Sequence, residues 1–196
     1  MPKNRKNKIV RLAVIGVMSA LSTLIYFVLP EIPLVPGVEY LKFDFSDIPA
    51  LLTGFLLGAW QGAAVELLKN LLHLFRSTSV GIGEVMNTVL GAAMIFAMAL
   101  FGKLLSKKCK KSRLSPAVYF VSAALTVAVT VAVGWALNLL LTPLYLKIMG
   151  LPVVKQTVFA GVTGSTLLNA VKAAFNLFPF YPVYFAVCRA FSKIDG

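Results

Sequence analysis

The feature that most restricts the fold is a stretch of 33 residues, 114–146, with no Asp, Glu, Lys or Arg. A helix needs about 20 mainly apolar residues to cross a bilayer, so this stretch must tilt or project beyond it. Runs at 9–29, 84–103 and 165–191 also have the length of a span. With 59% hydrophobic and 13% charged residues, the chain is predicted to be an all-α integral membrane protein.

The basic residues gather at the ends of the apolar runs. Thirteen of the 19 Lys and Arg lie within residues 3–11, 103–113 and 189–193. The positive-inside rule assigns such clusters to the cytoplasm, whereas a nucleic-acid surface would interleave them with aromatic residues. We therefore expect both termini to be cytoplasmic, with a basic tail at 1–8, a basic loop at 103–114 and no nucleic-acid partner.

An apolar run at 48–75 is predicted to form two short helices. Its 28 residues would span about 42 Å as one helix, which exceeds the hydrocarbon core of about 30 Å. Because the run is too long for one helix, we expect a break near 58–62. Gly54, Gly58 and Gly62 recur within the run and allow a neighbouring helix to approach closely. The chain is then a single domain, 1–196, built as a six-helix bundle with a long extracellular first loop at 31–47.

Prolines and the outer loop add detail to this topology. Pro143 is expected to bend or end the fifth helix, 115–149, and Pro179 and Pro182 to kink the sixth, 165–191. In the first loop, residues 39–45 are expected to be extended. A loop of this length without helix is often a lid, which is the role that we predict for it.

Polar residues that hydrocarbon disfavours gather toward the outer side of the predicted bundle. Lys172 is expected about 10 Å from the outer end of the sixth helix, and Asn138 about 16 Å from that of the fifth. Asn side chains both donate and accept hydrogen bonds, so such a set suits a flat heteroaromatic solute with alternating C=O and N–H groups. The set comprises Glu66, Asn70, His73, Glu84, Asn87, Asn138, Asn169, Lys172 and Asn176.

Structural explanations for the same residues remain open. Asparagines within membrane helices often join one helix to another, and Lys172 could form a buried ion pair with Glu84 or Glu66. Asp44 and Asp47 could cap the following helix. Glu66, Asn70 and His73 could be structural or could face the ligand.

Three motifs carry a resemblance to a known family. LKFDFSDIPALLTGFLLG (41–58), VELLKNLLH (65–73) and GIGEVMN (81–87) resemble the riboflavin-specific substrate-binding (S) components of the energy-coupling factor (ECF) transporters, the RibU family. The similarity extends over residues 11–189. Asn169 and Lys172 match the family's NxxK pair, and Asn138 matches the asparagine that precedes a Pro-Leu-Tyr.

The resemblance implies high-affinity capture of riboflavin outside a bacterial cell, by a multi-pass protein of the cell membrane. Asn138, Asn169 and Lys172 would bind the isoalloxazine ring while the loop around residues 40–44 closes over it; riboflavin would be the transported ligand and not a cofactor. FMN or another vitamin is the alternative ligand, since relatives with this fold bind other vitamins. The predicted ligand-binding residues are Tyr40, Leu41, Lys42, Phe43, Asp44, Glu84, Asn87, Asn138, Asn169 and Lys172.

The resemblance also implies a partner complex. Gly16 and Ala20 stand where the family has a small-residue strip that docks on the transmembrane coupling (T) protein, although packing within the protein would explain the same spacing. Two ATP-binding cassette ATPases would supply the energy, because this chain has no GxxxxGK[ST] motif.

An intramembrane hydrolase using Ser79 or Ser165 with His73 is a weaker hypothesis. No GxSxG elbow accompanies these residues, so we expect no enzyme activity. A purely structural subunit, with no ligand in the pocket, is a third hypothesis. The chain has a single His and no spacing typical of a metal site, so no metal is expected.

Overall fold

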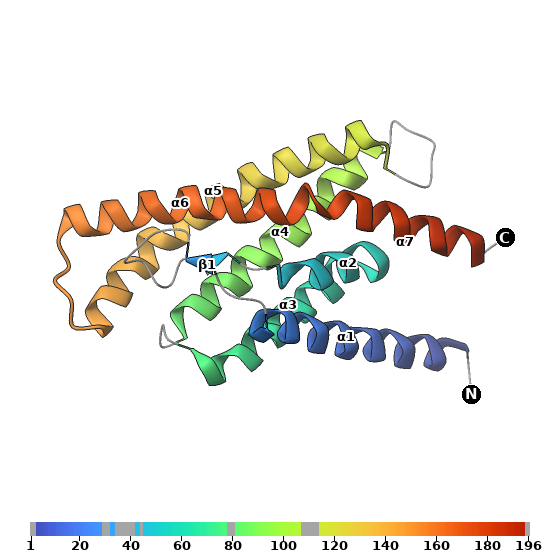
Figure 1. The fold of residues 1–196 in the computed structure, drawn as a ribbon, viewed down its shortest axis with the longest axis horizontal. Helices are drawn as coiled ribbons and strands as arrows, with labels where there is room; N and C mark the ends of the chain where they lie inside the picture. Colours follow the sequence, from blue (N-terminus) through green and yellow to red (C-terminus); the bar gives the residue numbers. More distant parts are fainter. Residues whose placement is uncertain are drawn as a thin grey trace.

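The structure, a computed structural model, describes residues 3–28, 32–33, 42–43, 45–77, 81–106 and 114–194. Within these ranges the chain is almost entirely helical, which confirms the predicted all-α class (Figure 1). The elements are α1 (Lys3–Val28), β1 (Ile32–Pro33), β2 (Lys42–Phe43), α2 (Asp47–Leu57), α3 (Ala59–His73), the 3-10 turn η1 (Leu74–Arg76), α4 (Ile82–Ser106), α5 (Pro116–Ile148), α6 (Lys155–Leu177) and α7 (Phe180–Ile194).

All six predicted helices are present, the sixth as two parts, α6 and α7. Four segments are long and apolar enough to cross a membrane: Lys8–Val28, Ile82–Ser106, Pro116–Ile148 and Lys155–Ala186. The shorter α2 and α3 form a hairpin between α1 and α4. In Figure 1 the start of α1, the end of α4 and the end of α7 lie toward the same end of the bundle. These are the helix ends at which the basic clusters occur.

The boundaries of the predicted tail and loops shift where helices extend into them. α1 begins at Lys3, so most of the predicted tail, 1–8, is helical. α2 begins at Asp47, the last residue of the predicted first loop. Lys42–Phe43 pairs antiparallel with Ile32–Pro33, so residues 42–43 are extended as expected.

The predicted break between α2 and α3 is confirmed at Gly58. Its φ of +120° is strained for any residue with a side chain. A Cβ on Gly62 would lie 2.7 Å from the carbonyl oxygen of Ala50 and 2.8 Å from Cα of Gly54. Gly54 and Gly62 therefore allow α2 and α3 to pack backbone against backbone.

The start of the sixth helix was predicted wrongly. α6 begins at Lys155, ten residues before the expected start, which puts Lys172 about 25 Å along the helix rather than about 10 Å. Two glycines and several β-branched residues in 153–164 gave this segment little helical signal. The helix forms there nonetheless, and α6 as a whole packs along α5.

The prolines act in two different ways. Pro143 lies inside α5, which continues to Ile148, so it does not end the helix. Asn138 thus lies about 15 Å from that end, close to the prediction. At Pro179 the helix is interrupted between Leu177 and Phe180, as expected for a proline.

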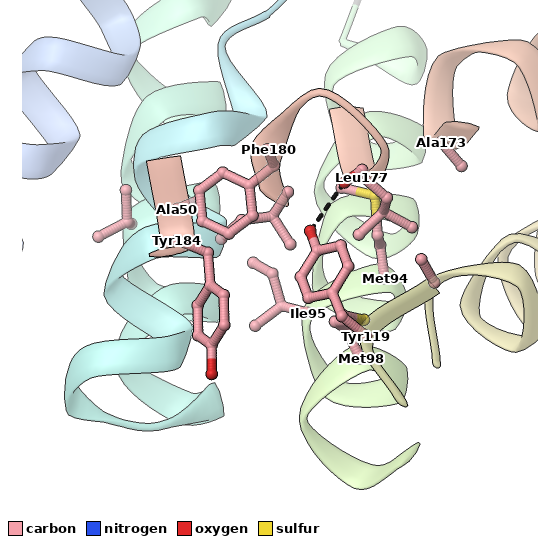
Figure 2. Close-up of a cluster of buried hydrophobic side chains, with 12 residues drawn as sticks. Ala50, Met94, Ile95, Met98, Tyr119, Ala173, Leu177, Phe180 and Tyr184 are labelled. Carbon is pink, nitrogen blue, oxygen red and sulfur yellow. Dashed lines mark hydrogen bonds between the residues drawn. The ribbon is translucent and has the colours of Figure 1, made fainter. Parts of the chain in front are cut away.

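One apolar core lies between α2, α4, α5 and the α6–α7 break (Figure 2). Its labelled members are Ala50, Met94, Ile95, Met98, Tyr119, Ala173, Leu177, Phe180 and Tyr184. The hydroxyl of Tyr119 donates to the carbonyl oxygen of Leu177 at 2.7 Å. This bond satisfies a carbonyl at the end of α6, where helical partners are missing.

Candidate functional site

Asp47, the first residue of α2, lies at the centre of a buried polar cluster. Its Oδ1 accepts a hydrogen bond from Nζ of Lys69 on α3 at 2.5 Å. Its Oδ2 accepts one from Nδ2 of Asn176 at 3.2 Å and lies 3.4 Å from Nζ of Lys172, both on α6. One carboxylate therefore joins three helices.

The cluster continues from Lys69 through α3 to α4. Nζ of Lys69 also lies 2.5 Å from Oε1 of Glu66. Nδ2 of Asn70 donates to the same Glu66 oxygen at 2.9 Å, and its Oδ1 accepts from Nδ2 of Asn87 at 3.0 Å. Oδ1 of Asn87 in turn accepts from Nζ of Lys172 at 2.5 Å. Because Lys172 also faces Asp47, the contacts close a ring.

Formal charges balance within this cluster. Asp47 and Glu66 face Lys69 and Lys172, and the side chains of Asp47, Glu66 and Lys69 are at most 3% exposed. A charge removed from water needs a partner and further hydrogen bonds to be tolerated. The cluster provides both.

Asn169 lies beside this cluster with an unused donor. It is one turn before Lys172 on α6, so the two side chains share a face. Its Nδ2 is buried and has no hydrogen-bond partner among the described residues. A Cβ on Gly134 of α5 would lie only 2.5 Å from this nitrogen, so the glycine leaves room for the amide.

Asn138 is adjacent, one turn after Gly134. Its Nδ2 donates to the carbonyl oxygen of Gly134 at 2.8 Å, and its Oδ1 accepts from Thr142 at 3.4 Å. Asn138 also lines a pocket between α4 and α5, whose other lining residues are Ile82, Gly83, Met86, Leu141, Thr142 and Tyr145. The structure therefore places Asn138 and Asn169 near Gly134, and Asn87 against Lys172. Of these four residues, Asn138 is the one that lines this pocket.

Glu84 occupies the edge of the site nearest α1. Its Oε1 lies 2.9 Å from Nδ1 of His73, and its Oε2 accepts from the hydroxyl of Ser77 at 2.9 Å. The His73 ring stacks on Tyr26 with centroids 3.8 Å apart. Both side chains thus have protein partners. Among the described residues, no group of three or more His, Cys, Asp or Glu could hold a metal ion.

Several predicted residues lie outside what the structure describes. Tyr40, Leu41 and Asp44 of the first loop are outside the described residues, as is Ser79 of the hydrolase hypothesis. Lys42 and Phe43 are described as the backbone of β2. Their predicted contacts with a ligand stay predictions.

Asp47 and Lys69 are the residues whose role the sequence did not reveal, whereas Asn176 joins α6 to α2 as an interhelical asparagine would. Capping of the helix by Asp47 was one explanation left open, and the structure does not show it: Ser46 is the N-cap residue, and Asp47 binds side chains of α3 and α6 instead. The ion pair of Lys172 is made with Asp47, an acid that the sequence interpretation did not consider. A carboxylate directly after an extended segment and before an apolar helix was the available signal.

The small-residue strip on α1 faces outward. Gly16 and Ala20 are exposed, and a Cβ on Gly16 would meet nothing within 4 Å among the described residues. The opposite face of α1 packs inward, where Ser22 donates to the carbonyl oxygen of Ser46. Packing against the described residues therefore does not explain the strip.

Known proteins resemble this chain over nearly its whole length. The family model "ECF transporter, substrate-specific component" matches residues 10–184. The riboflavin transporter FmnP of Bacillus subtilis (strain 168) is 30% identical over 175 residues, which are 84% of this chain and 85% of that protein. The riboflavin transporter RibU of Lactococcus lactis subsp. cremoris (strain NZ9000) is 31% identical over 170 residues, 85% of this chain and 78% of that protein.

A solved structure agrees with this family. It is described as "Structure and mechanism of the S component of a bacterial ECF transporter", and it matches with a TM-score of 0.73 at 26% identity, covering 95% of this chain and 98% of that chain. Such a component is a transporter subunit and not an enzyme. The sequence match and the helical architecture lead to one conclusion: this chain belongs to the family of substrate-specific components of ECF transporters.

Proposed function

We propose that this protein captures riboflavin from outside the cell as the substrate-binding subunit of an ECF-type vitamin importer. The observation that carries the proposal is the position of Asn169, which lies against Gly134 of α5, one turn from Asn138, and one turn before Lys172 on α6. The amide of Asn169 has a buried donor without a partner, and a ligand carbonyl would satisfy it. Asn138 and Lys172 supply further hydrogen-bonding groups on either side of it.

The relatives support riboflavin as the ligand. The two proteins compared above carry the name riboflavin transporter and align with this chain at about 30% identity. The isoalloxazine ring has alternating C=O and N–H groups along one edge. Asparagine side chains can bind such an edge, because each both donates and accepts hydrogen bonds. Tyr40, Phe43 and their neighbours in the first loop would close over the ring.

The orientation and partners belong to the same proposal. With both termini and residues 103–114 in the cytoplasm of a bacterial cell, the three basic clusters obey the positive-inside rule. The exposed Gly16–Ala20 strip would dock on the T component, which would couple it to two ATPases. Gly16→Leu should then reduce co-purification with that complex while flavin binding stays unchanged.

Titration of the detergent-purified protein with riboflavin tests the ligand. We expect quenching of flavin fluorescence on binding, and a loss of affinity of about 10-fold or more for Asn169→Ala and Lys172→Ala. Lys155→Ala is the matched control, because it makes the same change at an exposed position of the same helix.

Three outcomes would contradict parts of the proposal. A protein that neither quenches flavin fluorescence nor co-purifies with a yellow ligand does not bind riboflavin. Wild-type affinity in both variants would remove Asn169 and Lys172 from the site. Tighter binding of FMN than of riboflavin would make the phosphate ester the ligand.

A further inference from the structure

Asp47 joins the first outer loop to the bundle. It follows Ser46, whose carbonyl oxygen accepts a hydrogen bond from Ser22 of α1, and it is only 2% exposed. Charged residues are rarely buried this deeply unless they are paired. A residue that only capped a helix could stay exposed. The burial of Asp47 therefore indicates a further role.

The two oxygens of the Asp47 carboxylate have different partners. Oδ1 is bound by Lys69, which Glu66 also holds from the other side. Oδ2 faces α6, where it meets Asn176 and Lys172. Lys69 and Asn176 thus hold the carboxylate in an orientation that presents Oδ2 to Lys172.

Lys172 needs such an anchor because its side chain is long. Four rotatable bonds let an ammonium group sample many positions, and fixing it costs rotamer entropy. Asp47 on one side and Asn87 on the other restrict the ammonium to the face that it shares with Asn169. This is the face to which the proposed function assigns the ligand.

We propose that Asp47 is a positioning residue for ligand capture, which holds the ammonium of Lys172 beside Asn87 and Asn169. Lys69 acts one step further away by fixing Asp47. This inference rests on the proposed function, because its readout is flavin affinity. Asp47 itself contacts protein side chains and is not assigned a contact with the flavin.

A double-mutant cycle tests the inference in the full-length, detergent-purified protein. Asp47→Asn keeps the shape of the side chain and removes its charge, and should weaken riboflavin binding about 10- to 100-fold. In a Lys172→Gln background the same change should alter the Kd by less than about twofold, because the residue that Asp47 positions is gone. Thr53→Val, a buried near-isosteric change on the same helix, is the control and should keep wild-type affinity.

A second variant separates binding from folding. Asp47→Asn alone leaves Lys69 with less compensating charge, which could prevent folding. Asp47→Asn/Lys69→Gln removes one charge of each sign and restores the balance of the cluster. We expect this variant to unfold thermally close to the wild type and still bind riboflavin at least about 10-fold more weakly.

Each outcome has one meaning. Wild-type affinity in Asp47→Asn or in the double variant would overturn the role of Asp47, as would an equal effect of Asp47→Asn with and without Lys172. A wild-type protein that binds no riboflavin would overturn the proposed function instead. The two failures are therefore distinguishable.

Discussion

The two ends of α2 lie in environments of opposite character. At its start, Asp47 belongs to a cluster of buried charges with Lys69 and Lys172. Two turns later, Phe55 packs against Phe180 and Tyr184, with ring centroids 5.7 and 4.9 Å apart. We call the first the polar cluster and the second the aromatic core. Residues that follow each other can belong to different regions: Asn176 donates to Asp47, whereas the carbonyl of Leu177 accepts from Tyr119.

The two regions differ in how completely they are satisfied. Three buried side-chain atoms without a hydrogen-bond partner, Oε2 of Glu66, Nδ2 of Asn169 and Oδ1 of Asn176, lie in or beside the polar cluster. In the aromatic core, the buried hydroxyl groups of Tyr119 and Tyr184 both have hydrogen-bond partners. A buried polar atom without a hydrogen bond costs about 1–3 kcal/mol of folding free energy. The unbonded atoms of the polar cluster therefore lower the stability of the fold, and a ligand or water that bonds to them would restore it.

The largest predicted effect comes from removing one charge of the polar cluster. Lys69→Met conserves volume but leaves Asp47 and Glu66 facing each other, which should cost about 3–5 kcal/mol of unfolding free energy. Unfolding of the purified protein by dodecyl sulfate in mixed micelles measures this loss. The control is Met98→Leu, a volume-conserving change in the aromatic core that should cost less than about 1.5 kcal/mol. Equal losses in the two variants would mean that the regions do not differ as described.

Removing volume from the aromatic core should have the next largest effect. Leu177→Ala opens a cavity at a fully buried position and should cost about 3 kcal/mol. Because the change preserves the polar cluster, the riboflavin Kd of the folded protein should stay within about twofold of the wild type. Leu167→Ala on the exposed face of the same helix is the control for stability. A large change in Kd would show that the two regions are energetically coupled.

Separating α2 from α3 should damage both regions together. In Gly62→Ala the new methyl group would lie 2.7–2.9 Å from backbone atoms of Ala50 and Gly54, which cannot move independently. We expect a loss of about 2–3 kcal/mol in stability and a weaker flavin affinity, since Asp47 shifts with α2. Thermal unfolding and flavin titration of one preparation measure the two effects. Gly164→Ala, where no described residue lies within 4 Å, should leave flavin affinity unchanged and raise stability by at most about 1 kcal/mol, because Ala favours a helix more than Gly does.

The smallest predicted effect comes from a single hydrogen bond in the aromatic core. Tyr119→Phe removes the donor to the carbonyl of Leu177 and keeps the ring contacts with Tyr181 and Tyr184. Stability should fall by about 1 kcal/mol and flavin affinity should not change. A shift in the midpoint of thermal unfolding measures the first quantity. A gain in stability would show that the buried carbonyl finds another donor.

Much of the fold could be predicted because its causes are local. The uncharged run at 114–146 is long enough for a span whatever its neighbours, and Gly58 breaks α2 from α3 because its φ excludes other residues. The start of α6 could not be predicted in this way. Residues with weak helical propensity are helical there, in a helix that packs along α5. The local sequence of α6 gives no information about that packing.

The same division runs through the candidate site. The sequence by itself determined that the chain is a helical membrane protein and that Asn138, Asn169 and Lys172 needed partners, because hydrocarbon penalises such side chains wherever the helix lies. Only the tertiary structure decided which partners they have. Asp47 and Asn176 are 129 residues apart, and the rotation of α2, α3 and α6 about their axes selects the contact between them. Hydropathy is a property of each residue, whereas a hydrogen bond between helices depends on how all of them pack.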